Sequence, residues 1–285
     1  MESTALVLGG GGITGIAWEI GLLAGLREVG MDLTTAGLMV GTSAGSVVSS
    51  QLAGGLDPEL LYASQIEPPV EGAESAAPLE LTLQTMAEIG AQATDAQQFR
   101  AQLGARARTA PTQGTEQEHI DQFASRLAIQ EWPERPLMIT GVDAESGEPI
   151  AWTRDSEVPL LLAIAASCAV PLVWPPVTID GRRYMDGGMR SPTNADLAVG
   201  ADSIVVLAPS GPDTAVGVGS MTPSQEVASL GAGVRSRIIA PDSAALTAIG
   251  PNALDPARRA AAAQAGRAQA TTELARELAD LWPAA

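Results

Sequence analysis

The stretch LVLGGGGITGIAWEIGLLAGL, residues 6–26, joins an apolar run, four consecutive glycines and a helical pattern. Residues 4–8 form a short run of strand-forming residues that ends at the first glycine. Beyond the glycines, apolar side chains recur at helical spacing, at Ile16, Ile20, Leu23 and Leu26. The stretch therefore predicts a strand, a tight turn and a helix, in that order.

A second stretch, GLMVGTSAGSVVSSQLAGG at residues 37–55, repeats this plan. An apolar run at 38–41 leads into a tight Gly/Ser turn, and a helix is predicted from Ala44 to the glycine pair at 54–55. Residues 202–209, DSIVVLAP, predict a further buried strand, and hairpin turns are expected at 145–147 and 180–181. Two strand–turn–helix units predict an α/β fold with a mostly parallel sheet covered by helices.

The remaining segments are helical in character. Residues 66–130 are rich in Ala, Gln, Glu and Thr without a strand pattern, so they predict a helical insertion, either a candidate lid or plain cover. A C-terminal helix is expected over 255–282, with Asp255 as N-cap and Pro256 at the first helical position. Because no repeat or long linker interrupts the chain, residues 1–285 are predicted to form a single domain.

Composition narrows the function classes. A formal net charge of −17 argues against nucleic-acid binding and predicts at most peripheral contact with a membrane. The single cysteine, Cys168, excludes an internal disulfide and a cysteine-based zinc cluster, and its apolar neighbours predict a packed, inert thiol. We expect neither a cofactor nor a metal. The start of the chain lacks signal-peptide features and no apolar run approaches a membrane span, so a cytoplasmic protein is expected.

The glycine turn admits three interpretations. Gly10, Gly12 and Gly15 match the G-x-G-x-x-G dinucleotide fingerprint, but the expected acidic partner, Asp32, follows a helix end rather than a second strand. A phosphate-binding P-loop needs a lysine followed directly by Ser or Thr, and this pair is absent from the turn. The third interpretation is a nest of backbone N–H groups at a helix N-terminus that binds a developing oxyanion.

A nucleophile candidate lies in the second turn. Residues 41–45 read Gly-Thr-Ser-Ala-Gly, a G-x-S-x-G pattern between a strand and a helix, which favours Ser43 as a nucleophile over a simple N-cap. The only histidine, His119, lies in a very polar stretch and precedes the downstream carboxylates. The Ser–Asp–His order of α/β-hydrolases therefore cannot be built, and His119 is expected to face solvent.

A carboxylate is the alternative base for this serine. Asp186 ends an apolar hairpin strand and is followed by Gly187 and Gly188, which allow a ligand or backbone to approach closely. An aspartate near its ordinary pKa of about 4 is a weak base for a hydroxyl, so this role requires a water-poor pocket. The alternative is that Asp186 is a turn residue that only binds backbone amides.

Four blocks together resemble the patatin-like phospholipase family: GGGITG at 10–15, GTSAG at 41–45, ASCAVPLVWPPV at 166–177 and DGG at 186–188. The resemblance implies a three-layer α/β/α fold and a Ser–Asp dyad that hydrolyses acyl esters of lipids. It implies Ser43 as nucleophile and Asp186 as general base. The backbone amides of Gly10, Gly11 and Gly12 would form the oxyanion hole, and the supporting motif glycines are Gly41, Gly45, Gly187 and Gly188.

One residue departs from the family pattern. Thr14 stands where the family usually has arginine. Together with the acidic chain, it favours a carboxylester or neutral lipid over a phospholipid as substrate. A non-catalytic lipid- or acyl-binding module on the same scaffold is the main alternative function, and nucleotide binding through the glycines is a third.

Overall fold

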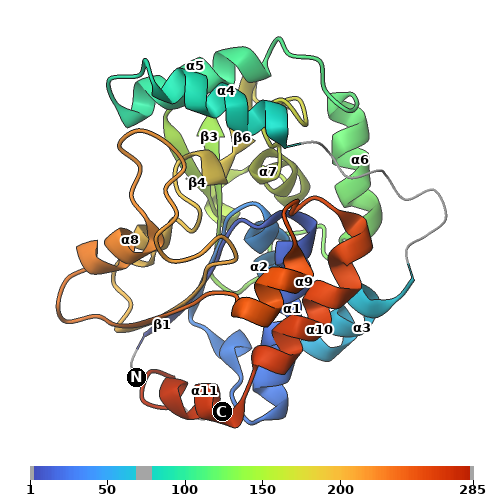
Figure 1. Ribbon diagram of the computed structural model, residues 1–285, viewed down its shortest axis with the longest axis vertical. Helices are drawn as coiled ribbons and strands as arrows, with labels where there is room; N and C mark the ends of the chain where they lie inside the picture. The colour runs from blue at the N-terminus through green and yellow to red at the C-terminus, as the bar shows by residue number, and fades with distance from the viewer. Residues whose placement is uncertain (1–2, 69–78, 283–285) are drawn as a thin grey trace.

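A mixed sheet lies at the centre of the fold (Figure 1). The computed structural model describes residues 3–68 and 79–282, and in this part of the chain the sheet has eight strands. They are β1 (Thr4–Leu8), β2 (Leu38–Gly41), β3 (Leu137–Asp143), β4 (Pro149–Trp152), β5 (Val177–Ile179), β6 (Arg182–Asp186), β7 (Ser203–Leu207) and β8 (Arg235–Ile239). The strand order is β5-β6-β3-β2-β1-β7-β8, and β4 pairs with β3.

The sheet is mostly parallel, as the sequence predicted. Strands β3, β2, β1, β7 and β8 run parallel, whereas β4 and β6 pair antiparallel with β3, and β5 with β6. Both expected hairpins are present, and the second turns at Asp180 and Gly181, which both have positive φ. The edge strand β8 was not predicted. The carboxyl ends of β1 and β2 meet at one edge, which is where the two glycine-containing turns lie.

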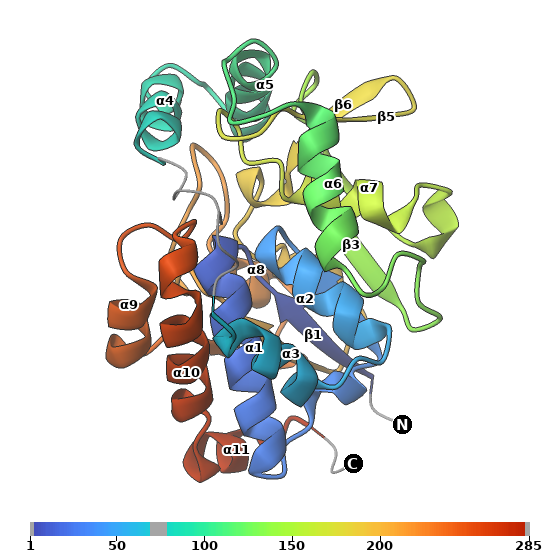
Figure 2. The same ribbon diagram turned by 90° about the vertical axis from the view of Figure 1, so that its right-hand side faces the viewer.

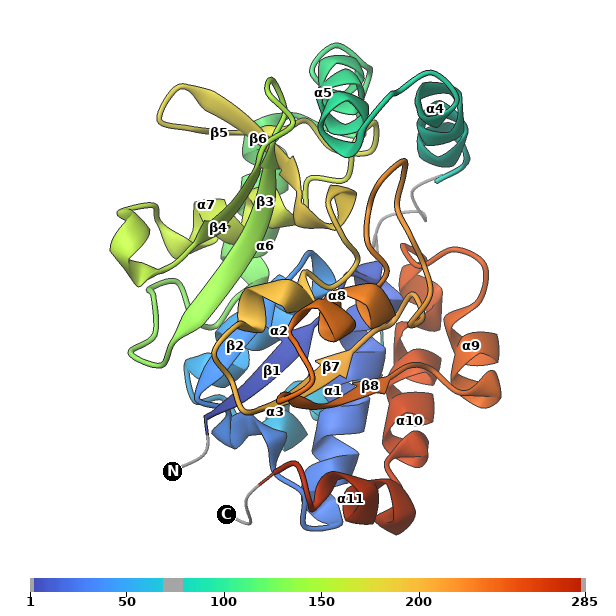
Figure 3. The same ribbon diagram turned by 90° about the vertical axis from the view of Figure 1, so that its left-hand side faces the viewer.

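Helices cover both faces of the sheet, which confirms the three-layer α/β/α fold (Figures 2 and 3). One face carries α1, α2 and α7, and the other carries α8 with a short 3-10 helix at Ala195–Ala198. The helices are α1 (Gly12–Glu28), α2 (Ala44–Ala53), α3 (Pro58–Ile66), α4 (Glu80–Gly90), α5 (Ala96–Ala107), α6 (Glu116–Arg126), α7 (Leu160–Ser167), α8 (Pro223–Ser229), α9 (Ser243–Ile249), α10 (Arg259–Gln269) and α11 (Thr272–Leu278).

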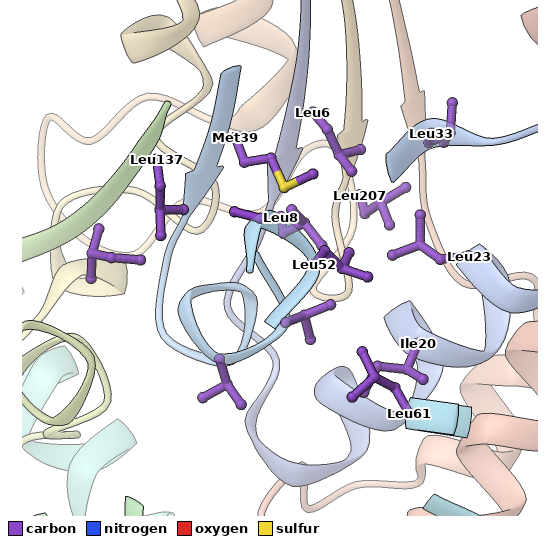
Figure 4. Close-up of a cluster of buried hydrophobic side chains, with 14 of the residues drawn as sticks. Leu6, Leu8, Ile20, Leu23, Leu33, Met39, Leu52, Leu61, Leu137 and Leu207 are labelled. Carbon is purple, nitrogen blue, oxygen red and sulfur yellow. The ribbon is translucent and has the colours of Figure 1, made fainter. Parts of the chain in front are cut away.

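The core between the sheet and α1 and α2 is aliphatic (Figure 4). Leu6 and Leu8 from β1 pack with Ile20 from α1 and Leu52 from α2, and all four are almost fully buried. Burial of a leucine or isoleucine side chain contributes about 1.5–3 kcal/mol, so this layer fixes the two helices whose N-termini carry the glycine turns.

The expected C-terminal helix over 255–282 is wrong as one continuous element. Helix α10 ends at Gln269, Ala270 has a non-helical ψ of 78°, and the Thr271 hydroxyl caps the new helix α11 by accepting from the Leu274 N–H. Backbone contact with α1 explains the alanine-rich composition, since a Cβ on Gly21 would lie 2.0 Å from the Ala263 carbonyl oxygen. Only small residues permit this approach.

The helical segment at 66–130 contributes α4, α5 and α6 in its described part, and its residues 69–78 lie outside the described residues. Ile89, Phe99 and Leu103 of α4 and α5 form a small core against Leu172 and Met189. Met189 follows the Asp186-Gly187-Gly188 block, so these helices lie beside it. In the ranges described, no helix is both long and apolar enough to cross a bilayer.

Candidate active site

Ser43 occupies a strained turn between β2 and α2. Its φ of 51° and ψ of −116° lie outside the regions that non-glycine residues ordinarily adopt. The turn packs tightly, because a Cβ on Gly45 would lie 2.0 Å from the Leu8 carbonyl oxygen and one on Gly41 would lie 2.2 Å from Ser49 Oγ. Glycines thus allow the sharp turn that places the Ser43 hydroxyl at the edge of the sheet.

Asp186 lies next to Ser43, although the two are far apart in the sequence. The Ser43 hydroxyl donates a hydrogen bond of 2.7 Å to Asp186 Oδ2. The second carboxyl oxygen accepts from the Gly188 N–H at 2.7 Å, and the Asp186 N–H donates to the Ala169 carbonyl. Both bonds orient the carboxyl group on the end of β6, so Asp186 has the geometry of a general base and that of a turn residue at once.

The surroundings of Asp186 are dry. Its side chain is 2% exposed, and this burial raises the pKa of the carboxyl to about 7 against the opposing effect of the hydrogen bonds from Ser43 and Gly188. A carboxylate with that pKa is a better base at neutral pH than one at its ordinary value. Asp186 is therefore shielded from solvent, as the role of a base for a hydroxyl would require.

The glycine turn lies against the serine. A Cβ on Gly10 would lie 3.4 Å from Ser43 Cβ, so the backbone here passes directly beside the hydroxyl. The Gly10 N–H donates to the Pro192 carbonyl at 2.8 Å. Within residues 3–68 and 79–282, the N–H groups of Gly11 and Gly12 have no acceptor. They are the unpaired donors of the N-terminus of α1, and Gly12 has a φ of 59° that suits glycine.

Thr14 binds a segment from the far end of the chain. Its N–H and its hydroxyl both donate to the Ala253 carbonyl, at 3.1 and 3.3 Å. The side chain is fully buried. A short threonine, paired with the Ala253 carbonyl, is therefore accommodated where the chain at Ala253 passes the start of α1.

His119 is buried, so the expectation that it faces solvent is wrong. It is 1% exposed, stacks on Trp174 with ring centroids 4.8 Å apart, and contacts Phe123 edge-on. Its Nε2–H donates to the Ala165 carbonyl at 2.9 Å, and burial lowers the pKa of the imidazole to about 4. The ring is therefore neutral at pH 7, and its Nε2 proton is committed to α7 rather than to Ser43.

Residues at the C-terminal end of α7 support the serine turn in a way that the sequence pattern did not predict. Ser167 Oγ accepts from the Ser43 N–H at 2.9 Å, and the Cys168 thiol donates to the Ser43 carbonyl at 3.3 Å. Burial and the nearby Asp186 raise the pKa of the Cys168 thiol, which keeps it in the unreactive protonated form. The described residues contain no group of three His, Cys, Asp or Glu side chains suited to a metal ion.

A serine on a strained strand-to-helix turn, beside a buried carboxyl group at the edge of a parallel sheet, is the arrangement of a hydrolase nucleophile elbow. The chain belongs to the patatin-like phospholipase family, whose sequence model matches residues 6–199. This is a family of lipid acyl hydrolases.

Two solved structures are similar to this chain. VipD from Legionella pneumophila shares 13% identity, with a TM-score of 0.38 and coverage of 72% of this chain and 50% of that one. The type III effector protein ExoU shares 15% identity, with a TM-score of 0.42 and coverage of 97% and 53%. The chain thus spans about half the length of each. No curated protein matches it by sequence.

Proposed function

We propose that the protein is a serine acyl hydrolase that cleaves carboxylic esters of lipids through Ser43 and Asp186. The observation that carries the proposal is the 2.7 Å hydrogen bond from the Ser43 hydroxyl to a buried Asp186 carboxyl group. Membership of the patatin-like phospholipase family supports the same reaction class.

The first half of the reaction forms an acyl-enzyme. Asp186 accepts the hydroxyl proton as Ser43 Oγ attacks the ester carbonyl carbon, and the carbonyl oxygen becomes an oxyanion. The N–H groups of Gly11 and Gly12 are the donors proposed for this oxyanion, helped by the positive end of α1. Gly10 was included in the sequence-based prediction, but its N–H donates to Pro192, so Gly10 serves by close approach of its backbone.

Collapse of the tetrahedral intermediate expels the alcohol, which takes the proton from Asp186, and leaves the acyl group on Ser43. Water then attacks the acyl carbonyl and gives its proton to Asp186. The second intermediate collapses with transfer of that proton back to Ser43 Oγ, which releases the carboxylic acid. The strained backbone at Ser43 holds its Oγ in the geometry for attack in both halves.

The preferred substrate is a neutral ester. Thr14 supplies no charge, and Arg190, which follows the Asp186-Gly187-Gly188 block, is paired with Asp196 at 2.5 Å and lies 3.9 Å from Glu226. With the net charge of −17, these contacts leave little to attract an anionic headgroup.

A substrate comparison tests the proposal. Short p-nitrophenyl esters and neutral acylglycerol emulsions should be hydrolysed about tenfold or more faster than vesicles of phosphatidylglycerol, because repulsion lowers the encounter rate with an anionic surface. The assay measures release of p-nitrophenol or of fatty acid at matched ester concentration. Equal or faster turnover of the anionic vesicles would contradict the proposed preference for neutral esters. If the protein hydrolyses none of these esters, the proposed hydrolase activity is wrong.

The pH dependence of kcat/KM should report Asp186. Only the ionised carboxylate accepts the Ser43 proton, so activity is expected to fall about tenfold per pH unit below the pKa of about 7 and to level off above it. Initial rates between pH 5 and 9 measure this acid limb, the part of the pH profile in which kcat/KM falls with falling pH. A limb near pH 4, the ordinary range of aspartate, would mean that burial does not raise the pKa of the carboxyl group that controls the rate.

A further inference from the structure

The loop at residues 191–194, which we call the clamp segment, contacts all three parts of the site. The Pro192 carbonyl accepts from the Gly10 N–H at 2.8 Å, which fixes the glycine turn. The Thr193 carbonyl accepts from the Thr42 hydroxyl at 3.2 Å, which fixes the serine turn. The Asn194 amide donates to the Gly187 carbonyl at 3.3 Å, which fixes the loop that carries Asp186.

Asn194 joins the last two parts through one side chain. Its Nδ2 shares two hydrogens among the Gly187 carbonyl, the Ser191 carbonyl at 3.0 Å and Thr42 Oγ1 at 3.0 Å. The Thr140 hydroxyl donates to the same Thr42 oxygen at 2.9 Å. Thr42 immediately precedes Ser43, and Gly187 immediately follows Asp186. A single buried amide group, 1% exposed, therefore bridges the chain neighbours of both members of the dyad.

The backbone of Asn194 favours this residue type. Its φ of 53° lies in the left-handed region, which Asn and Asp adopt more readily than other non-glycine residues. Its side-chain oxygen accepts from Arg190 at 2.7 Å, so both ends of the amide are used.

The clamp segment is itself anchored to the opposite layer. Glu226 of α8 is fully buried and accepts from the Thr193 hydroxyl and the Ala195 N–H, both at 2.8 Å. Burial of a carboxyl group is costly without such partners, so this anchor allows few alternative positions for the loop. Hydrogen bonds therefore connect α8, through the clamp segment, to the neighbours of Ser43 and Asp186.

We propose that Asn194 is a positioning residue, which holds Ser43 and Asp186 at hydrogen-bond distance by tying Thr42 to Gly187. The inference rests on the proposed function, because the distance between Ser43 and Asp186 matters for activity only if these two residues react as a pair. Misplacement of a reacting group by about 1 Å can cost on the order of 100-fold in rate, so a tie between the two neighbours has a direct effect on kcat.

The test uses isosteric variants. Thr42→Val removes the hydroxyl that receives the Asn194 amide, and Thr42→Ser restores it. Asn194→Asp keeps the left-handed backbone and replaces the donor nitrogen with an acceptor oxygen. Thr4→Val is the matched control, because Thr4 is another buried threonine that accepts one hydrogen bond, from the Gly37 N–H, at the opposite end of the sheet.

We expect Thr42→Val and Asn194→Asp to lower kcat tenfold or more with KM within about twofold, and Thr42→Ser to recover most of it. Release of the base loop also weakens the Gly188 bond that lowers the pKa of Asp186, so the acid limb of Thr42→Val should move to higher pH. Thr4→Val should keep wild-type kcat and the wild-type acid limb, with a smaller loss in Tm than Thr42→Val, because Thr42 makes more hydrogen bonds than Thr4.

Outcomes separate the two proposals. If wild-type protein hydrolyses esters and both clamp variants keep kcat within twofold, the positioning role is wrong and the proposed function stands. If Asn194→Asp does not fold, the Thr42→Val and Thr42→Ser pair decides, and absence of rescue by serine overturns the inference. If wild-type protein hydrolyses no ester, both proposals fail together.

Discussion

Ser43→Ala is expected to remove ester hydrolysis almost completely, lowering kcat/KM by a factor on the order of 10⁴ or more. The variant loses the only atom that can form the acyl-enzyme bond, while the glycine turn remains to bind the ester. The alanine side chain has no hydroxyl to replace the one that donates to Asp186 at 2.7 Å, so the variant has no nucleophile at position 43. Initial rates on p-nitrophenyl butyrate at pH 8 measure the loss.

Ser50→Ala provides the matched control. Ser50 is also fully buried on α2, and its hydroxyl donates to the Val47 carbonyl at 2.9 Å. Loss of such a bond costs about 1 kcal/mol of stability, so this variant should keep nearly full activity with a small drop in Tm. Residual hydrolysis above a hundredth of wild type in Ser43→Ala would show that another nucleophile acts.

Asp186→Asn is expected to lower kcat/KM by about 10²- to 10⁴-fold, because the amide cannot accept the Ser43 proton. The fold should tolerate the change, since the amide oxygen can still accept from the Gly188 N–H. Asp143→Asn is the control, because Asp143 ends the neighbouring strand and likewise accepts N–H bonds from its own turn. It should retain most of the activity.

Stability gives this prediction a second readout. The folded-state pKa of Asp186, about 7, lies above the ordinary value near 4, so its contribution to stability is full below pH 4 and is lost as pH rises through 7. Asp186→Asn has no such dependence and should therefore have a higher Tm than wild type at pH 8. An equal or lower Tm at pH 8 would mean that the ionised Asp186 carboxylate does not destabilise the folded protein.

The two strand–turn–helix units were predictable because their patterns are local. A Gly-rich turn between an apolar run and a helical period marks the carboxyl edge of a parallel sheet, and GTSAG and DGG contain Ser43 and Asp186, the two groups proposed to react. Parallel pairing then brings the turns after β1 and β2 together without further information.

Other features depend on contacts that no local pattern records. His119 lies in a polar stretch, yet its ring is buried by Trp174 and the end of α7. Strand β8 has the sequence RSRII and lies at the edge of the sheet, and its two arginines obscure the apolar pattern by which a strand is predicted. The role proposed for Asn194 depends on Thr42 and Gly187, which contact it only in the folded chain.

The Thr14 position shows the same limit. A comparison of motifs marks it as a departure, and the structure supplies its partner, the Ala253 carbonyl, more than two hundred residues away. The hydrogen bonds explain why a threonine is accommodated there.

Covalent labelling tests the central claim most directly. Wild-type protein incubated with a fluorophosphonate at pH 8 should carry one adduct per chain, and peptide mapping by mass spectrometry should place it on Ser43. Asp186→Asn should acquire the same adduct at least 100-fold more slowly. An adduct on a different residue, or an active esterase whose Ser43 stays unlabelled, would contradict the assignment of Ser43 and Asp186 as the reacting pair.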